Sequence, residues 1–361
     1  MVYPAYGLII TIAVAVYLWW PNQRSKLLPA LVAITGFSVY VALRGAYAGS
    51  DTINYVNAFI QLQTVTFDYL SITTTFISNG VTAAEPGFIL LAYAVKWLQL
   101  PYEFFLGITA FVSLVALYIG YRKLSPDAFL ATILYLFSIT AVSLQANVIR
   151  QAIAVGMFIV AVAYLTERKH FKFLFFSVSA GLFHISAFAL VPLLVISIFI
   201  RRHIIFWLGV VFALGLALTG LFGSFLSLFI GGVFLTKIQT YFQFGFEALL
   251  TFKLLSFFIF YAFLLFLREQ AETDDERYQL NTLSLVYIAC FFLQAFFMGD
   301  EVASERFGLY RFALEPVIIS FLPIVTRQPD LTRAAVIFLA MVYGFIVYNL
   351  PTVVNMLGGY S

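Results

Sequence analysis

Residues 171–200 have the sequence FKFLFFSVSAGLFHISAFALVPLLVISIFI, in which Lys172 and His184 are the only ionisable side chains. A straight helix needs about 20 apolar residues to cross the hydrocarbon core of a bilayer, so this stretch is too long for one span and too short for two. Basic residues flank it on both sides, at 168–172 and 201–202. The pattern predicts a re-entrant hairpin that breaks around Gly181–His184, with His184 pointing outward, where the freed backbone is buried in protein or lines a wet cavity.

The rest of the chain has the composition of a membrane protein. Hydrophobic residues make up 63% of the 361 residues and charged residues 10%, and the mean hydropathy is +0.99. The apolar runs are continuous rather than alternating, which is typical of membrane helices and not of a β-barrel. We therefore predict an all-α, polytopic integral membrane protein that forms a single transmembrane domain over residues 1–361, with roughly 11–14 transmembrane helices including re-entrant and interfacial ones.

Charge and cysteine content exclude several other classes. A net charge of +3 gives no reason to expect a nucleic-acid partner. Cys290 is the single cysteine, which excludes a disulfide framework and a cysteine metal site, and no metal-ligand motif such as HExxH or DxD occurs. We expect no cofactor and no metal. Residues 3–20 lack a basic start and a small-residue cleavage site, so we predict a first span there rather than a signal peptide.

The positions of the basic residues predict the topology. We expect spans at 4–20, 27–43, 84–99, 102–120, 127–143, 147–166, 173–199 (broken), 204–222, 250–267, 281–298, 309–325 and 334–350. Basic connectors favour the cytoplasm, and they lie at 24–26, 122–123, 168–172, 201–202, 268–277 and 327–333. This orientation requires that one of the segments 84–99 and 102–120 only half-spans, and it makes 127–166 a hairpin that turns near 144–146.

The remaining segments are predicted to lie outside the bilayer core. Residues 44–83 and 223–249 mix aromatic and aliphatic residues with polar ones, which indicates periplasmic amphipathic helices at the interface. Ser50-Asp51-Thr52 offers N-cap chemistry for the first of these helices. Residues 268–280 are predicted to be a cytoplasmic loop, and 299–308 an external segment.

Polar residues that could form a site gather on the outer side in this topology. Ionisable side chains at membrane depth are costly and are candidates for function by default. Arginines there suit a pyrophosphate group, because the guanidinium stays charged and donates two parallel hydrogen bonds. A histidine or carboxylate can act as a general base. The candidates are His184, Asp51 and Arg150 for catalysis, and Arg44, Thr52, Tyr55, Glu85, Gln151, Arg306, Tyr310 and Arg311 for substrate binding.

Structural interpretations compete with the functional ones for several of these residues. Arg44 directly follows a span and could be an interfacial anchor, and His184 could be a core histidine with satisfied hydrogen bonds. Asp51-Thr52 could be only a helix cap, and Glu85 could simply begin a helix. Arg311 and Glu315 are four residues apart on one helix face, which is typical of a structural ion pair.

The order of these residues resembles the EpsG family, which is grouped with the Wzy-type polymerases of bacterial exopolysaccharide, capsule and O-antigen synthesis. The resemblance covers nearly the whole chain and is best at RQA and FHxSA, and weakest after Tyr310, where Arg311 departs from the expected aromatic residue. It is carried by Arg44, Gly49-Ser50-Asp51-Thr52-x-x-Tyr55, Glu85-Pro86-Gly87-Phe88, Val148-Ile149-Arg150-Gln151-Ala152, Leu182-Phe183-His184-Ile185-Ser186-Ala187, and Arg306 with Tyr310.

This resemblance implies a glycosyltransferase of GT-C-like architecture in the bacterial inner membrane, with its active site facing the periplasm. Such a polymerase transfers an undecaprenyl-pyrophosphate-linked glycan onto a lipid-linked repeat unit, and a flippase and a chain-length regulator are expected partners. We expect Arg150 and Arg306 to hold the donor pyrophosphate with support from Arg44 and Arg311. His184 is then the first candidate for the base and Asp51 the second, and the reaction is expected to be metal-independent.

Three other classes stay open at this point. An O-antigen ligase performs the same chemistry but typically has a large periplasmic loop. A polysaccharide or lipid transporter also places charges in the membrane but more often shows internal repeats of its spans, and none is clear here. A membrane-bound acyltransferase would also use a histidine, supplied with acyl thioester from the cytoplasm.

Overall fold

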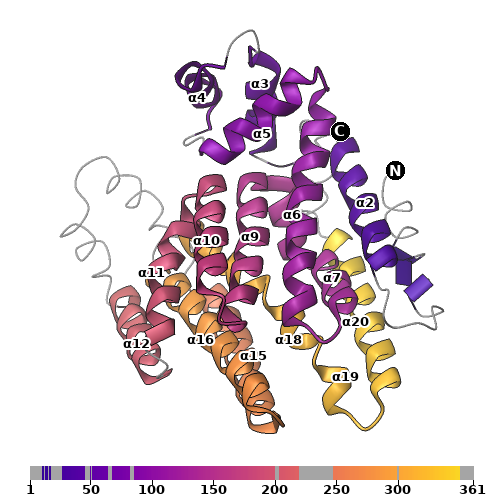
Figure 1. Cartoon of the computed structure of the whole chain (residues 1–361), viewed down its shortest axis with the longest axis vertical. Coiled ribbons are helices and arrows are strands. Elements are labelled where there is room, and N and C mark those ends of the chain that lie inside the picture. The colour runs from indigo at the N-terminus through magenta and orange to yellow at the C-terminus, as the bar shows by residue number, and fades with distance from the viewer. Residues whose placement is uncertain are drawn as a thin grey trace.

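The computed structural model describes residues 10–11, 13–14, 16–17, 27–44, 49, 51–63, 67–81, 85–199, 203–218, 247–298 and 301–349. Every regular element in this part of the chain is a helix, and the helices form a bundle with a small cap at one end (Figure 1). The prediction of an all-α, polytopic membrane protein is thus confirmed. The cap consists of α3 (Thr52–Gln61), α4 (Tyr69–Ser78) and α5 (Pro86–Trp97).

The bundle is built around α9, on which only Met157 and Tyr164 are not buried. Small residues let its neighbours approach closely. A Cβ on Gly156 would lie 2.5 Å from the Ser113 carbonyl oxygen on α6, and one on Gly120 would lie 2.6 Å from Ile159. The helices of the bundle are α2 (Leu27–Leu43), α6 (Tyr102–Leu124), α7 (Ala128–Leu136), α8 (Ile139–Val142), the π-helix η1 (Ser143–Asn147), α9 (Ile149–Thr166), α10 (His170–Phe183), α11 (Ser186–Phe199), α12 (His203–Leu218), α15 (Glu247–Gln270), α16 (Asp274–Phe296), α17 (Glu301–Phe312), α18 (Glu315–Ile319), α19 (Leu322–Val325) and α20 (Pro329–Asn349).

Full-length membrane helices among the described residues are fewer than the 11–14 helices expected, a number that also included re-entrant and interfacial ones. Five are long and apolar enough to cross a membrane, namely α6, α9, α16, the run 302–325 and α20. A sixth is formed if α7 and the segment 139–147 count as one span bent by 70°. The count falls because several expected spans are short, broken or bent, and because 309–325 is not one helix but part of a run of three helices that begins already at Glu301.

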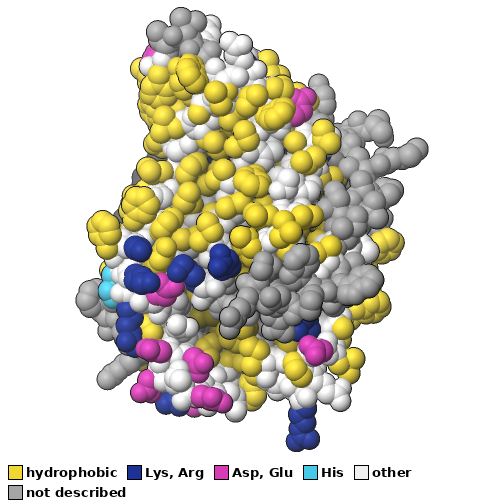
Figure 2. Space-filling model, turned by 45° about the vertical axis from the view of Figure 1, so that its right-hand side comes forward, with side chains coloured by type: hydrophobic (Ala, Val, Ile, Leu, Met, Phe, Trp, Pro, Cys, Tyr) yellow, Lys and Arg dark blue, Asp and Glu magenta, His cyan; other side chains and the backbone are white. Residues whose placement is uncertain are grey.

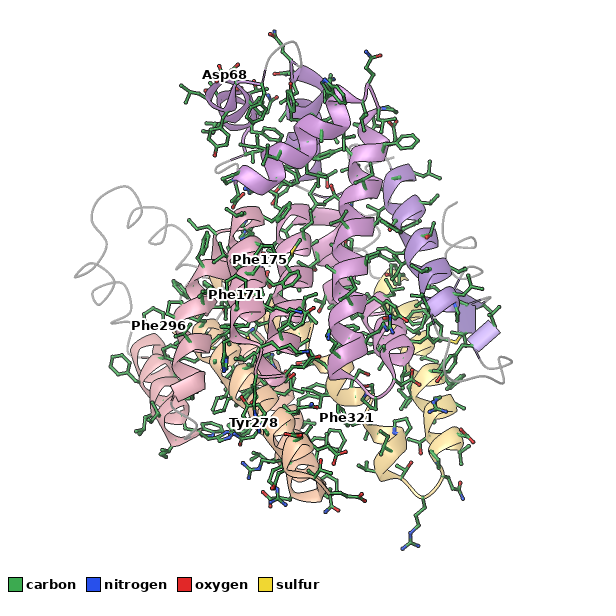
Figure 3. All side chains as sticks on the ribbon, in the orientation of Figure 1. Asp68, Phe171, Phe175, Tyr278, Phe296 and Phe321 are labelled. Atoms are coloured by element: carbon green, nitrogen blue, oxygen red, sulfur yellow. The ribbon has the colours of Figure 1, made fainter. Side chains whose placement is uncertain are left out.

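The break in the long apolar stretch is where the sequence predicted it. Helix α10 ends at Phe183, His184 is extended, and α11 begins at Ser186. Each helix has 14 residues, about 21 Å at 1.5 Å per residue, so neither is long enough to cross the bilayer. Gly181 permits the turn, because a Cβ there would lie 2.4 Å from the ring of Phe188. Beyond the exposed His170 and Lys172 at its start, the outer face of α10 is mainly apolar, and Phe171 and Phe175 are 84% and 58% exposed (Figure 3).

The half-span required by the topology is α5, which has 12 residues, about 18 Å. Helices α3 and α4 lie in the segment 44–83, where amphipathic helices were expected, and residues 223–246 of the second such segment lie outside the described part. Asp51 is the N-cap of α3, as expected, but its side chain makes no cap hydrogen bond. Instead the Asp51 backbone N–H donates to Asn147 Oδ1 at 3.0 Å, which ties the cap to η1.

The described basic connectors lie at the opposite end of the bundle, which we call the basic end. Figure 2 shows Lys and Arg side chains low on one face, beneath a wide hydrophobic area. Lys123 pairs with Glu167 and Arg168 with Asp275 across three connectors. The expected loop at 268–280 is much shorter, because a capping box between Thr273 and Glu276 starts α16 at Asp274.

Candidate functional site

Three breaks in helical structure meet under the cap. The π-helix η1 leads into the start of α9, α10 gives way to α11 at His184, and α5 begins after Glu85. Single-turn π-helices occur often at functional sites, and helix ends leave backbone groups free to bind other partners. A Cβ on Gly87 would lie 2.9 Å from the Leu182 carbonyl oxygen, so the glycine lets α5 approach the end of α10. The motifs EPGF, RQA and FHxSA therefore come together in space.

Arg150 connects these elements. Its Nε donates to the Tyr55 hydroxyl at 3.1 Å, and its Nη1 forms a short ion pair with Glu85. The other Glu85 oxygen accepts the backbone N–H of Ile185 at 3.3 Å. Arg150 and Glu85 are both buried, so their charges compensate each other away from water. The guanidinium thereby holds two cap helices against the α10–α11 break.

His184 belongs to a second chain of hydrogen bonds. Its Nδ1 lies 2.6 Å from Ser186 Oγ and accepts the Ser186 backbone N–H at 3.3 Å. Ser186 Oγ lies 2.9 Å from the Tyr310 hydroxyl, so α17 is joined to the break. All three residues are buried. The structure therefore brings His184 and Tyr310 together through Ser186, which the sequence analysis quoted in a motif but did not select.

Arg44 is buried with unused donors. Its Nη2 donates to Thr52 Oγ1 at 2.9 Å, and Thr52 Oγ1 donates to the Ala146 carbonyl at 2.8 Å. Its Nε and Nη1 are buried without a hydrogen-bond partner among the described residues. A buried donor without a partner is costly and needs an explanation, such as a ligand. Gly49 lets the backbone after α2 pass close to η1, since its φ is +88° and a Cβ there would lie 2.3 Å from the Ala146 carbonyl oxygen.

Gln151 and Arg306 form the remaining contact. Gln151 Nε2 donates to the Arg306 carbonyl at 2.5 Å, while Gln151 Oε1 is buried and has no partner in the described part of the chain. The Arg306 side chain is half-buried and lies within electrostatic range of Tyr55 and His184. Its guanidinium makes no hydrogen bond or ion pair with the residues that the structure describes. Arg306 is thus a cation beside the His184 cluster that has no carboxylate partner there.

Arg311 is placed elsewhere. Its guanidinium is fully buried and bonds Gln294 Oε1 at 2.9 Å, the Tyr287 hydroxyl at 2.8 Å and Ser256 Oγ at 3.2 Å. It also pairs with Glu315 at 3.1 Å, which agrees with the structural interpretation of this i,i+4 pair. Each guanidinium nitrogen is bonded within the protein, and four of the five N–H donors are used, so the structure favours the structural interpretation of Arg311.

Asn147 is the polar residue that the sequence analysis missed, although its amide holds Asp51. Its only signal is its place at the predicted turn before Arg150. Asp51 itself is half-buried and lies within electrostatic range of Tyr55. Among the described residues, no three His, Cys, Asp or Glu side chains lie close enough together to hold a metal ion.

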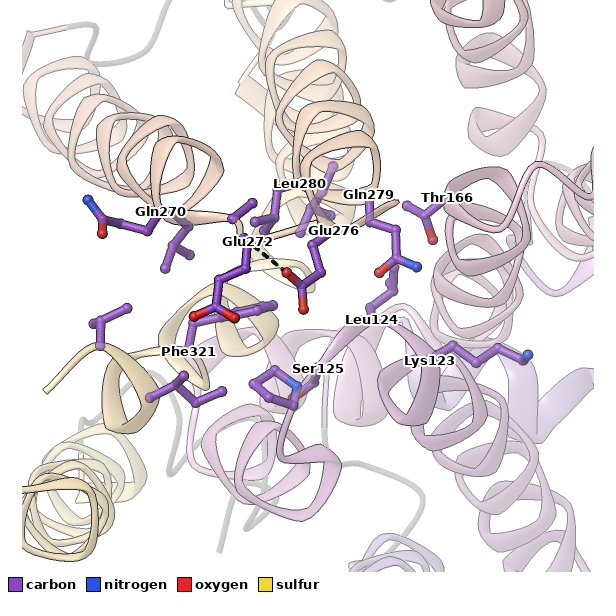
Figure 4. Close-up of a pocket in the computed structure, with 16 residues that line it drawn as sticks. Lys123, Leu124, Ser125, Thr166, Gln270, Glu272, Glu276, Gln279, Leu280 and Phe321 are labelled. Carbon is purple, nitrogen blue, oxygen red and sulfur yellow. Dashed lines mark hydrogen bonds between the residues drawn. The ribbon is translucent and has the colours of Figure 1, made fainter. Parts of the chain in front are cut away.

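A cavity of about 500 Å³ lies at the basic end, far from these residues (Figure 4). The carboxylates of Glu272 and Glu276 face it, with Lys123 and Ser125 at its rim. Two of its charged groups already have partners, since Glu276 closes the capping box and Lys123 pairs with Glu167. Nothing in this cavity combines a nucleophile, a base and free donors, so the His184 cluster is the better candidate.

Comparisons with known proteins agree with the resemblance. Two curated relatives are named EPS I polysaccharide export inner membrane protein EpsF, one from Ralstonia solanacearum, 30% identical over 182 residues, and one from Ralstonia nicotianae, 29% identical over 181. Each match covers 47% of this chain and 43% of the relative. No solved structure matches. The sequence model of the EpsG family, however, matches residues 27–357, and the chain therefore belongs to the EpsG family.

Proposed function

We propose that the protein is a polysaccharide polymerase of the bacterial inner membrane. It would transfer an undecaprenyl-pyrophosphate-linked glycan onto a lipid-linked repeat unit at the periplasmic face. The observation that carries the proposal is a pair of arginines: Arg44, which has buried donors without a partner among the described residues, and Arg306, which lies within electrostatic range of His184. The relatives' names, which mention polysaccharide export and the inner membrane, support the substrate class and the location.

The chemistry of this transfer needs two things from the protein. The bond between the donor sugar and the pyrophosphate breaks with its electrons left on the phosphate oxygen, so preorganised donors must stabilise that charge. Arg44 and Arg306 would do so, since the charge of Arg150 is already compensated by Glu85. The acceptor hydroxyl must also lose its proton, for which the sequence offers His184 and Asp51. Tyr55, Thr52, Glu85, Gln151 and Tyr310 would hold the surrounding groups in place.

Single alanine variants of Arg44, Arg306 and His184 test the proposal in a strain that lacks the native gene. We expect short or absent polymer ladders at matched protein levels, with accumulation of lipid-linked repeat units. Arg122→Ala is the matched control, because Arg122 is an exposed arginine at the basic end, and it should leave the ladder unchanged. Normal long chains in all three variants would refute the site.

Export of the polysaccharide is the second candidate function, because the name of the relatives refers to it. The two functions differ in what reaches the cell surface. Without a polymerase, single repeat units still arrive there, whereas without an exporter all of this glycan is lost from the surface. Loss of all surface glycan in the deletion strain would therefore favour export, or a ligase, over polymerisation.

A further inference from the structure

The imidazole of His184 caps a helix. The first N–H groups of an α-helix have no partner within the helix, and a side chain that accepts them stabilises its start. Here the Ser186 N–H, at the first residue of α11, donates to Nδ1 of His184 at 3.3 Å. The His184 carbonyl accepts the next N–H, from Ala187, at 3.0 Å. The ring is thus fixed in the position of a capping acceptor.

This geometry determines which ring nitrogen carries the proton. A backbone N–H can only donate, so Nδ1 must present its lone pair to it. The Ser186 hydroxyl, 2.6 Å from Nδ1, then donates to the same nitrogen and can accept from the Tyr310 hydroxyl at 2.9 Å. All hydrogen bonds in the chain from Tyr310 to His184 then run in one direction, with no two hydrogens facing each other.

The surroundings also oppose a second proton on the ring. The N-terminus of α11 carries a partial positive charge, which disfavours a cation at its cap. Arg150 and Arg306 both lie within electrostatic range of the imidazole. Its Nε2 forms no hydrogen bond with the described residues, although His184 as a whole is only 5% exposed.

We propose that His184 is neutral with its proton on Nε2, and that it serves the reaction as a hydrogen-bond donor to a substrate oxygen rather than as the general base. This inference rests on the proposed function. In the transfer step, the bond from the donor sugar to pyrophosphate breaks, the bond to the acceptor oxygen forms, and the acceptor proton goes to a carboxylate, for which Asp51 is the remaining candidate. His184 stabilises the leaving pyrophosphate oxygen without giving up its proton. Ser186 and Tyr310 are positioning residues that fix the tautomer.

The test separates a donor from a base with two substitutions. The amide of glutamine reaches about as far as Nε2 and donates hydrogen bonds, but it has no useful basicity. With full-length protein and lipid-linked repeat units extracted from the deletion strain, His184→Ala should lose about 10²–10³-fold in elongation rate, the usual cost of a lost transition-state donor. His184→Gln should retain at least about ten times the rate of the alanine variant, at equal thermal stability.

Chemical rescue of His184→Ala gives a second, independent readout. Imidazole has an N–H and a lone pair, whereas 1-methylimidazole keeps the lone pair but lacks the N–H. Rescue by imidazole alone supports a donor. Equal rescue by both compounds, or a glutamine variant as slow as the alanine variant, would overturn the donor role while leaving the polymerase proposal intact. Full elongation activity in His184→Ala would also overturn the donor role, whereas no elongation by the native protein would refute the polymerase proposal itself. If neither compound restores elongation, the rate of His184→Gln relative to His184→Ala decides between the donor role and the base role.

Discussion

Two buried arginines, Arg150 and Arg311, have similar partners but different surroundings. Each pairs with a glutamate and bonds a tyrosine hydroxyl. Arg311 lies in the middle of the bundle, where its partners come from α15, α16 and α18, and its ring contact with Phe312 is 4.4 Å. Arg150 lies at the start of α9, where three helix breaks meet. Arg44 and Gln151 there have buried atoms without partners among the described residues.

The difference indicates what distinguishes a structural charge from a functional one in this protein. A buried ion pair is weak evidence of function by itself, because the protein can satisfy it completely. Every guanidinium nitrogen of Arg311 has a partner in the protein, although the neighbouring Gln294 Nε2 is buried without a partner among the described residues. Around Arg150 the ion pair is satisfied, but Arg44 has buried charged donors without a partner among the described residues, which would suit an anionic ligand.

The largest expected effect is on stability at Arg311. Arg311→Leu leaves Glu315 without its cation in the core, which should cost about 3–5 kcal/mol. We expect a strongly lowered melting temperature in detergent and little folded protein. The double variant with Glu315→Gln should recover much of the loss, because the uncompensated charge is gone. An unchanged melting temperature in Arg311→Leu would contradict the structural role of Arg311.

The next effect is on activity at Arg150. Arg150→Lys keeps the charge, but a single ammonium cannot reach Tyr55 and Glu85 in the fork geometry of the guanidinium. We expect elongation to fall by about 10²-fold, as for lost preorganisation, with a much smaller change in melting temperature than at Arg311. The matched control is Arg311→Lys, which should lower the melting temperature more than Arg150→Lys does. Unchanged polymer length in Arg150→Lys would show that the cap does not depend on the guanidinium geometry.

A smaller effect is expected from the glycine beside Arg44. Gly49→Ala introduces a Cβ at positive φ, which costs roughly 1–2 kcal/mol, and places it against the Ala146 oxygen. Gly80→Ala is the control, since its φ is +85° but its nearest neighbour is the Asn54 side chain at 3.4 Å. We expect Gly49→Ala to shorten the polymer more than Gly80→Ala does. Equal ladders and melting temperatures for the two variants would show that the contact with η1 is unimportant.

The smallest effect concerns the basic end. Partial burial raises the pKa of the Glu167 carboxyl, but hydrogen bonds from Lys123 and Lys169 outweigh it and hold the pKa below its ordinary value. The stabilisation is therefore present above the unfolded pKa of 4.5 and is lost as the pH falls through the lower folded value. Glu167→Gln should cost less than about 1 kcal/mol at pH 7. The difference in melting temperature from the native protein should shrink at pH 4, and polymer length should not change.

The sequence could predict the elements more easily than their depth in the bilayer. Hydropathy gave the span 27–43 with the ends that α2 has, and the basic flanks of residues 171–200 gave the break at His184. Hydropathy overestimated the length of straight helix in 84–99 and 309–325. An apolar sequence fits a half-span or a bent run of short helices as well as a straight helix. The predicted turn at 144–146 is instead a π-helix that continues towards α9, which no local pattern distinguishes.

By itself, the sequence determined the class of the protein, the order of its helices and most of the candidate residues, because the cost of burying charge in hydrocarbon makes each such residue conspicuous. Only the tertiary structure decided their partners. It separated Arg311 from Arg150, joined His184 to Tyr310 through Ser186, and left Arg44 with buried donors. These outcomes depend on which helix ends meet under the cap, and that is set by packing between residues more than 90 positions apart rather than by any local motif.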